Sequence, residues 1–306
     1  MQWLAEKYNK IYLKYTKSYG PFPDKDKIYK LLVEKQLNKL PFIFVRGESN
    51  LREMKEKLRL KVPLHSFPDI SISLKAESKK WALSYVSRLG VDLSRKIGGI
   101  SPSTVVAGIK TRNSSSSCGG NHIKLCKEII EFYRLNGLQV LLIPHSLDDG
   151  KNLKSCDLAL TKKIYNELEN KRDIILVDDM NLTYGQVRAI IGLLDFYATS
   201  RYHSLSSALC MAVPVVALSW HIKYGDIMRL FLDDFLVVNC RTNSIKKSLA
   251  LIKKYYYNRQ WFDKEKMLER KKEIVKEIDK SVTILANEVR RLLEHKNNSM
   301  EKCSGG

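Results

Sequence analysis

A strand–turn–helix–strand pattern at residues 195–224 constrains the fold of this chain more than any other feature. The stretch reads DFYATSRYHSLSSALCMAVPVVALSWHIKY. An apolar run ends at Thr199, a helix-forming segment of small residues follows, and Val213-Pro214 ends that segment before a second apolar run at 215–218. This order is typical of a βαβ unit, whose parallel strands end at the same edge of a sheet. Ligands bind at that edge in open α/β sheets.

The rest of the chain repeats the alternation of strand and helix. Buried-strand patterns followed by helical patterns occur at residues 97–103, 139–143 and 174–177. A shorter series precedes them, with an apolar run at 41–45 and a helix at 50–58. We therefore predict an α/β fold with two domains. The second domain is expected to hold a parallel sheet with at least four strand–helix repeats and helices on both faces.

The domain boundaries follow from changes in pattern along the chain. A helical segment at 75–94 is expected to cross between the domains, and the charged segment 264–294 carries apolar residues at helical spacing. We expect the following division: an N-terminal domain at 1–94, a C-terminal domain at 95–243, C-terminal helices at 244–296 and a disordered tail at 297–306.

The charge of the chain favours anionic partners. Lysine and arginine number 53 against 33 acidic residues, a formal net charge of +20. Phosphorylated small molecules, an anionic membrane surface and nucleic acid all suit such a charge. The chain contains neither an aromatic RNP segment nor a zinc finger, so we expect no specific nucleic-acid binding. A basic surface in contact only with solvent is the simpler alternative.

Six cysteines without a CxxC pair, no signal peptide and no apolar run near ~18 residues favour a reduced, cytoplasmic protein. Peripheral contact with the inner membrane face stays open on this evidence. Metal binding is not expected, because no spacing of histidine and cysteine ligands requires an ion.

Arg201 and His203 stand at the start of the helix within the 195–224 pattern. Backbone N–H groups at a helix N-terminus attract anions, and an arginine fork binds phosphate or carboxylate through two hydrogen bonds. A histidine, with an ordinary pKa near ~6.5, can donate a proton near neutral pH. Lys223, after the next strand, adds a second positive charge. These residues predict a site for an anionic substrate that requires protonation.

Ser101, Ser103 and His145 follow neighbouring predicted strands and are further candidates for binding the anion. A histidine at a strand end is more often structural, and a serine-proline-serine turn needs no ligand. A serine hydrolase is disfavoured because the chain has no GxSxG elbow. A nucleotide oxidoreductase is disfavoured because no GxGxxG follows a first strand.

The same residues resemble the C-terminal signature of the polysaccharide pyruvyl transferase family. The resemblance is carried by Ser200-Arg-Tyr-His203, the helix of small residues, Val213-Pro-Val-Val-Ala-Leu218, Trp220 and Lys223-Tyr224. Weaker segments match in the same order: Ser18-Tyr-Gly-Pro-Phe22, Phe44-Val-Arg-Gly-Glu-Ser49, Pro68-Asp69, Gly99-Ile-Ser-Pro-Ser103 and Leu142-Ile-Pro-His145. The likeness covers about residues 15–238.

The resemblance implies two Rossmann-like domains facing a cleft, as in GT-B glycosyltransferases. It also implies transfer of a pyruvyl group from phosphoenolpyruvate to a sugar of a cell-surface polysaccharide or glycan precursor, as a pyruvate ketal. Phosphoenolpyruvate is then a co-substrate, and no cofactor is expected. In the family's Arg-x-His element the arginine binds the donor and the histidine is the general acid. These roles fall on Arg201 and His203.

Family members usually begin with a strand and a glycine-rich turn that are not found in this sequence, so the N-terminal, acceptor-side domain is expected to be shortened. Two alternative functions stay open. One is a GT-B-like glycosyltransferase that uses a nucleotide sugar, and the other is a non-catalytic relative that binds glycan. For the pyruvyl transferase hypothesis, lipid-linked and nucleotide-linked forms of the glycan precursor both stay open as the acceptor, and the sequence leaves the oligomeric state open.

Overall fold

The computed structural model describes residues 2–8, 10–20, 22–108, 117–148, 155–258 and 262–304. The chain forms two compact units, one of Met1–Ser73 with Lys272–Gly306 and the other of Leu74–Lys271. Both contain parallel sheets with helices, so the predicted α/β class is confirmed. Among the described residues, no helix is long and apolar enough to cross a membrane.

The smaller unit contains a three-stranded parallel sheet in the order β1-β2-β3. Its elements are α1 (Gln2–Lys7), β1 (Lys14–Lys17), α2 (Lys27–Leu37), β2 (Ile43–Arg46), α3 (Glu48–Lys57), β3 (Leu64–Phe67) and the 3₁₀ helix η1 (Ile70–Ser73). The central strand β2 is buried on both faces, as the apolar run at 41–45 predicts. Its side chains pack against Leu37 of α2 and Met54 of α3.

The larger unit contains six parallel strands in the order β6-β5-β4-β7-β8-β9. They are β4 (Ile97–Ser101), β5 (Gln139–Leu142), β6 (Ile174–Leu176), β7 (Phe196–Thr199), β8 (Val215–Ser219) and β9 (Val237–Asn239). From β4 the chain builds outward to β6, and then returns to place β7 on the other side of β4. The direction of building therefore reverses between β4 and β7, and such a reversal opens a crevice at the carboxyl ends of the two strands.

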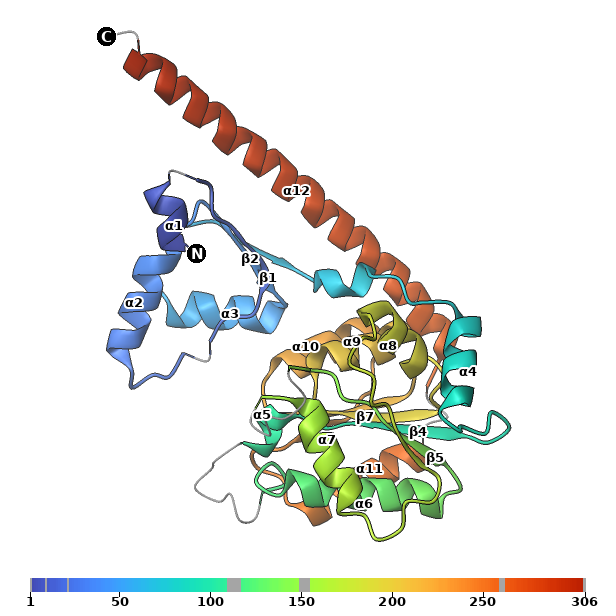
Figure 1. Ribbon diagram of the computed structural model, residues 1–306. Helices are drawn as coiled ribbons and strands as arrows, with labels where there is room; N and C mark the ends of the chain where they lie inside the picture. Colours follow the sequence, from blue (N-terminus) through green and yellow to red (C-terminus); the bar gives the residue numbers. More distant parts are fainter. Residues whose placement is uncertain are drawn as a thin grey trace. The chain divides into compact units, whose positions relative to one another are not determined.

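Helices cover both faces of the larger sheet, as predicted. They are α4 (Lys79–Arg88), α5 (Thr104–Ala107), α6 (His122–Leu135), α7 (Asp157–Asn166), α8 (Tyr184–Ile191), α9 (Tyr202–Cys210), α10 (Lys223–Phe231) and α11 (Ile245–Tyr257). Figure 1 shows α8, α9 and α10 on one face and α6 and α11 on the other. Neighbouring side chains can pack closely against β4 because it carries glycines. A Cβ at Gly98 would lie 2.6 Å from the ring of Tyr133, and one at Gly99 would lie 2.4 Å from Leu194.

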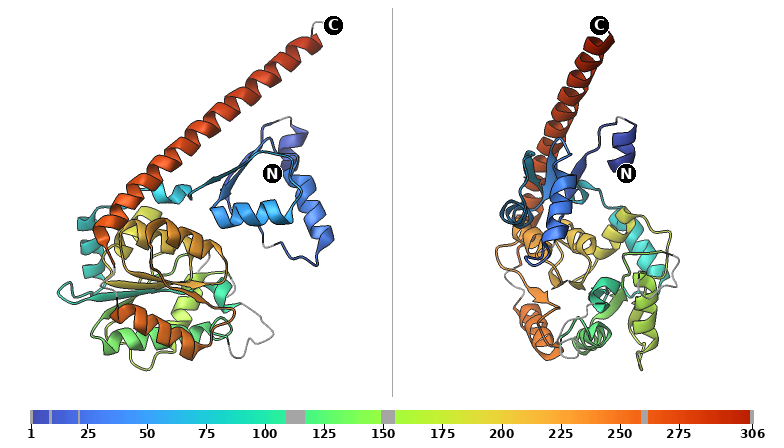
Figure 2. Two further views of the ribbon diagram at one scale, coloured as in Figure 1. Left: turned by 180° about the vertical axis from the view of Figure 1, so that it is seen from behind. Right: turned by 90° about the vertical axis from the view of Figure 1, so that its left-hand side faces the viewer.

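The unit boundaries differ from those expected from the sequence. Helix α4, expected to end the N-terminal domain, belongs to the larger unit because it packs against α8. The backbone N–H of Glu77, just before α4, also donates to the carbonyl of Gly185 in α8. Helix α12 (Lys264–Ser304) is continuous, as Figure 2 shows, and the unit boundary falls within it. It continues to Ser304, through most of the segment for which we expect a disordered tail.

Candidate active site

The candidate site lies at the carboxyl ends of β4 and β7, where the order of the sheet reverses. Ser101 at the end of β4 pairs in register with Thr199 at the end of β7. The next residue, Ser200, donates its backbone N–H to the Ser101 carbonyl at 3.0 Å. Beyond these residues the helices α5 and α9 begin, so their first turns lie beside each other. The geometry thus joins two segments about 100 residues apart in the sequence.

Arg201, which precedes the first residue of α9, is held by a fully buried carboxylate. Its Nε and Nη2 atoms each donate to one oxygen of Asp157 at 2.6 Å, and Nη2 also donates to Thr104 Oγ1 at 3.0 Å. The side chain remains 18% exposed, and within the described part of the chain its Nη1 atom has no hydrogen-bond partner. Arg201 therefore lies at the predicted place with Nη1 as the donor that can bind an anion.

Asp157, the first residue of α7, was not among the residues predicted from the sequence. Besides Arg201, it accepts backbone N–H groups from Thr104 at 3.0 Å and from Ser146 at 2.9 Å. The sequence contains a weak indication of this role, because an acidic residue at the start of a helix is favoured by the helix dipole. Its pairing with an arginine 44 residues later depends on the tertiary fold.

His203 is exposed in the first turn of α9, where an imidazole can reach both solvent and a bound ligand. Its ring lies among three other rings, with centroid distances of 5.5 Å to Tyr202, 6.4 Å to His145 and 6.4 Å to Tyr184. The hydroxyl of Tyr184 donates to the His203 carbonyl at 3.2 Å, which fixes the backbone of this turn. The arrangement suits a proton donor, because the backbone that carries the ring is held in place.

His145, after β5, lines a cavity of about 160 Å³ beside His203. Its other lining residues are Ile143, Pro144, Leu147, Val177, Asp179, Leu182, Tyr184 and Val187. The side chain is half-buried, but its Nδ1 atom is buried and has no hydrogen-bond partner among the described residues. Burial, together with the nearby positive charges of His203 and Arg201, lowers the pKa of His145 to about 3. At neutral pH it is thus an uncharged polar group facing a cavity.

Lys223, the first residue of α10, is half-buried within a group of aromatic rings. Its Nζ atom lies 5.0 Å from the ring centroid of Trp220, 5.5 Å from that of Tyr202 and 5.8 Å from that of Tyr224. Cation–π attraction holds the ammonium at this position. Tyr224 in turn donates its hydroxyl to the Ser200 carbonyl at 2.7 Å. The structure therefore brings Lys223 to the α9 start, as the sequence predicts.

Ser101 and Ser103 are fully buried, which distinguishes them from the exposed candidates. The Ser103 hydroxyl caps α5 by accepting the Val105 N–H at 3.2 Å. Ser101 acts through its carbonyl, which accepts both the N–H and the hydroxyl of Ser200. The structure thus shows both serines supporting the backbone of the site, and contact of their hydroxyls with a ligand stays a prediction.

His122, at the start of α6, is a second residue that the sequence did not indicate. Its Nε2 atom accepts the Ser103 N–H at 3.3 Å and lies 3.1 Å from Ser200 Oγ, so it links the ends of β4 and β7. Complete burial is the main reason that the pKa of His122 is lowered to about 4. The ring is therefore neutral at neutral pH.

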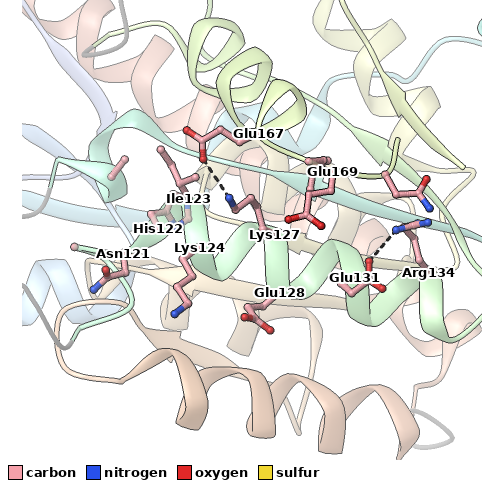
Figure 3. Close-up of a pocket in the computed structure, with 14 residues that line it drawn as sticks. Asn121, His122, Ile123, Lys124, Lys127, Glu128, Glu131, Arg134, Glu167 and Glu169 are labelled. Atoms are coloured by element: carbon pink, nitrogen blue, oxygen red, sulfur yellow. Dashed lines mark hydrogen bonds and ion pairs between the residues drawn. The ribbon is translucent and has the colours of Figure 1, made fainter. Parts of the chain in front are cut away.

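A larger cavity, of about 940 Å³, lies between α6 and the chain after α7 (Figure 3). Charges of both signs line it and neutralise one another: Lys127 pairs with Glu167 at 3.2 Å and Arg134 with Glu131 at 2.8 Å. These pairs do not favour an anionic ligand. We therefore assign the site to the β4 and β7 ends, although the cavity beside them, which His145 lines, is smaller.

Comparisons with known proteins concern the fold and the family of the chain. Solved structures with similar folds include the S. aureus protein MnaA with UDP (TM-score 0.55, 10% identity, 92% of this chain and 72% of that one). Another is Anabaena HepE with UDP and glucose (TM-score 0.59, 12% identity, 93% and 74%). A third is the UDP-GlcNAc 2-epimerase of Neisseria meningitidis bound to UDP-GlcNAc (TM-score 0.54, 12% identity, 90% and 72%). At these identities the likeness concerns the fold, and it confirms the predicted GT-B-like class.

A search of curated protein sequences finds no match. A family model does match: that of the polysaccharide pyruvyl transferases, over residues 18–222. This match spans more than half of the chain and contains Arg201 and His203. The chain therefore belongs to the polysaccharide pyruvyl transferase family and is a transferase.

Proposed function

We propose that this protein transfers a pyruvyl group from phosphoenolpyruvate to two hydroxyls of one sugar in a cell-surface polysaccharide or its precursor. The products are a cyclic pyruvate ketal and phosphate. The observation that carries this proposal is that two side chains occur together where the strand order of the sheet reverses. One is Arg201, which Asp157 holds in place, and the other is the exposed His203. Family membership supports the same class of reaction.

Arg201 and Lys223 bind the two anionic groups of the donor in this proposal. The side-on pair with Asp157 fixes the plane of the guanidinium and directs Nη1 away from the carboxylate, toward a ligand. Lys223 supplies a second positive charge on the β8 side of the site. Asp157 offsets part of the charge of Arg201, so two cations are needed to hold a phosphate and a carboxylate together.

His203 donates a proton to the methylene carbon of phosphoenolpyruvate, which becomes a methyl group. The central carbon then accepts the first sugar hydroxyl, the bond from this carbon to the phosphate oxygen breaks, and the second hydroxyl closes the ketal. The two hydroxyls release two protons. One restores the proton of His203, and the other leaves with phosphate or water. Phosphoenolpyruvate is the only co-substrate in this scheme, and no cofactor or metal takes part.

A glycosyltransferase that uses a nucleotide sugar is a second candidate, because the similar solved structures from S. aureus, Anabaena and Neisseria meningitidis contain UDP or a UDP-sugar. Thermal-shift titration separates the two candidates. A ligand at 100 times its dissociation constant stabilises a protein by about 2.7 kcal/mol. Stabilisation by phosphoenolpyruvate and not by UDP-sugars is expected, and the reverse result would favour the glycosyltransferase.

The direct experiment is incubation with phosphoenolpyruvate and a panel of glycosides that includes lipid-linked sugars. Release of phosphate and appearance of the ketal methyl signal in the proton NMR spectrum are expected with at least one acceptor. A protein that binds glycan but neither binds phosphoenolpyruvate nor releases phosphate would instead be a non-catalytic relative.

A further inference from the structure

Helix α2 in the smaller unit is apolar on two opposite faces, and only one of them is covered. Val33 and Leu37 face the core of that unit. On the other side Ile28, Leu31 and Leu32 are 74%, 64% and 58% exposed. Their spacing of three and four residues places them on one face of the helix. A surface helix normally keeps its apolar residues on the one face that packs on the core, so this second, exposed apolar face indicates a partner.

The helix itself is well formed, so this exposure does not come from a frayed segment. Asp26 caps its N-terminus by accepting the Tyr29 N–H at 2.9 Å. The side chain of Asn38, at the other end, donates to the Arg59 carbonyl at 3.1 Å. The apolar face is therefore presented by a rigid element.

Lysines surround this apolar face. Lys25, Lys27 and Lys35 are exposed, and in the described part of the chain none of them has an ion-pair partner. The nearby carboxylates are engaged elsewhere. Asp24 pairs with Lys57 and Lys30, Asp26 caps the helix, and Glu34 accepts the Arg59 N–H at 2.9 Å. The face therefore has an aliphatic centre and a positively charged rim.

We propose that α2 docks this protein on an anionic lipid surface. Aliphatic residues on a short helix enter the boundary between headgroups and acyl chains, while lysines at the rim attract anionic headgroups. The formal charge of +20 on the whole chain adds a long-range attraction. On the proposed function, such docking brings the enzyme to the surface where lipid-linked sugar acceptors lie.

A protein partner fits this face less well. Protein interfaces are enriched in aromatic residues, methionine and arginine, and depleted in lysine. The footprint is also small. A helix of 11 residues is about 16 Å long and about 10 Å wide, far below the ~800 Å² that each partner buries in a stable complex. A lipid surface requires no such shaped interface.

The test is co-sedimentation of the full-length protein with vesicles of phosphatidylcholine alone or of phosphatidylcholine with one-third phosphatidylglycerol. We expect the protein to bind the anionic vesicles and to bind the neutral vesicles at least about tenfold more weakly. Salt should release it from the anionic vesicles. Two double variants test the two parts of the face: Leu31→Gln/Leu32→Gln removes apolar side chains, and Lys27→Gln/Lys35→Gln removes charges. Each should bind anionic vesicles at least about tenfold more weakly than the wild type does.

The matched control is Leu135→Gln, which changes a leucine that is 77% exposed on α6 of the larger unit. It should bind as the wild type does. Equal binding to both kinds of vesicle, no binding to either, or an equal loss in the control overturns the inference. A different outcome would assign the face to a second copy of the chain. In that case the wild type would not bind vesicles, would be a dimer in sedimentation velocity, and would become a monomer with Leu31→Gln/Leu32→Gln.

The same variants separate this inference from the proposed function. Phosphate release with a soluble acceptor and no vesicles should be unchanged in Leu31→Gln/Leu32→Gln, because these residues are exposed and lie outside the candidate site. Loss of vesicle binding with intact phosphate release places the lipid contact at α2. Absence of phosphate release in the wild type contradicts the proposed function and leaves the vesicle result to be judged by itself.

Discussion

Asp157 forms a side-on ion pair with Arg201, with two N–H···O distances of 2.6 Å, and is itself completely buried. Thr104 completes the group, since its hydroxyl accepts from Arg201 at 3.0 Å and donates to Asp157 at 3.3 Å. One carboxylate thus joins the starts of three helices, α5, α7 and α9. It orients the guanidinium so that only Nη1 faces away from the pair.

Asp157→Asn should reduce both stability and donor affinity. The amide presents one oxygen where two are needed, and it leaves the partly buried arginine charge without its counterion. Removing one partner of a buried pair costs about 3–5 kcal/mol, which urea unfolding would measure. The KM for phosphoenolpyruvate should rise about tenfold or more, with a smaller change in kcat, because Arg201 loses its orientation.

The control for this prediction is Asp178→Asn, which removes a carboxylate from a partly exposed pair with Lys162. It should change the free energy of unfolding by no more than about 1 kcal/mol. Equal KM values for Asp157→Asn and the wild type would contradict an orienting role of Asp157.

His203→Asn should lower kcat by about 10²–10⁴-fold and leave donor binding intact. The reason is that general acid catalysis contributes this range, whereas the charges that hold the donor belong to Arg201 and Lys223. The measurement is the rate of phosphate release together with the thermal shift caused by phosphoenolpyruvate. Because His203 is exposed, the unfolding free energy should change by about 0.5 kcal/mol at most.

His221, which follows the next strand, provides the comparison for His203. Its Nδ1 atom accepts the backbone N–H of Lys223 at 3.3 Å, so it has a local structural contact. His221→Asn should retain kcat within a few-fold. A similar kcat for His203→Asn and the wild type would mean that another group supplies the proton.

Stability should fall as the pH is lowered from about 6.5 toward 4, owing to His122. Its pKa is about 4 in the folded protein and ~6.5 when unfolded, so the unfolded state binds more protons between these values. The contribution of this neutral histidine is complete above the unfolded pKa. It should be smaller by about 2 kcal/mol at pH 5 than at pH 7.5.

Urea unfolding at the two pH values measures this difference, and His122→Gln should reduce it. His145, whose pKa is also lowered, adds to the same window in both proteins and therefore does not affect the comparison. An identical pH dependence in the variant and the wild type would show that His122 is not buried as a neutral ring.

Gly99→Ala should destabilise the larger unit by about 1–3 kcal/mol. The added methyl group would meet Leu194 at 2.4 Å and the ring of Tyr197 at 2.7 Å, and both side chains are buried. The change is measured by the midpoint of chemical unfolding. Leu135→Ala, at an exposed position, is expected to lie within about 0.5 kcal/mol of the wild type. Equal midpoints for Gly99→Ala and the wild type would contradict the tight packing at β4.

The sequence by itself determined the local elements of the larger unit and the place of its chemistry. Apolar runs mark parallel strands buried on both faces, so β5 and β8 could be predicted where they occur. The motif holding Arg201 and His203 follows such a strand, and its position at the carboxyl edge is a local consequence of βαβ geometry.

Only the tertiary structure decided which strand ends meet and which side chains pair with the charged groups of the site. The order of the strands depends on contacts between distant segments, and no local pattern encodes that β7 pairs with β4. The same holds for Asp157, which neutralises part of Arg201, and for the rings around Lys223. Local hydrogen bonding and side-chain periodicity specify elements, whereas the partners of a buried charge are specified by the packing of the whole unit.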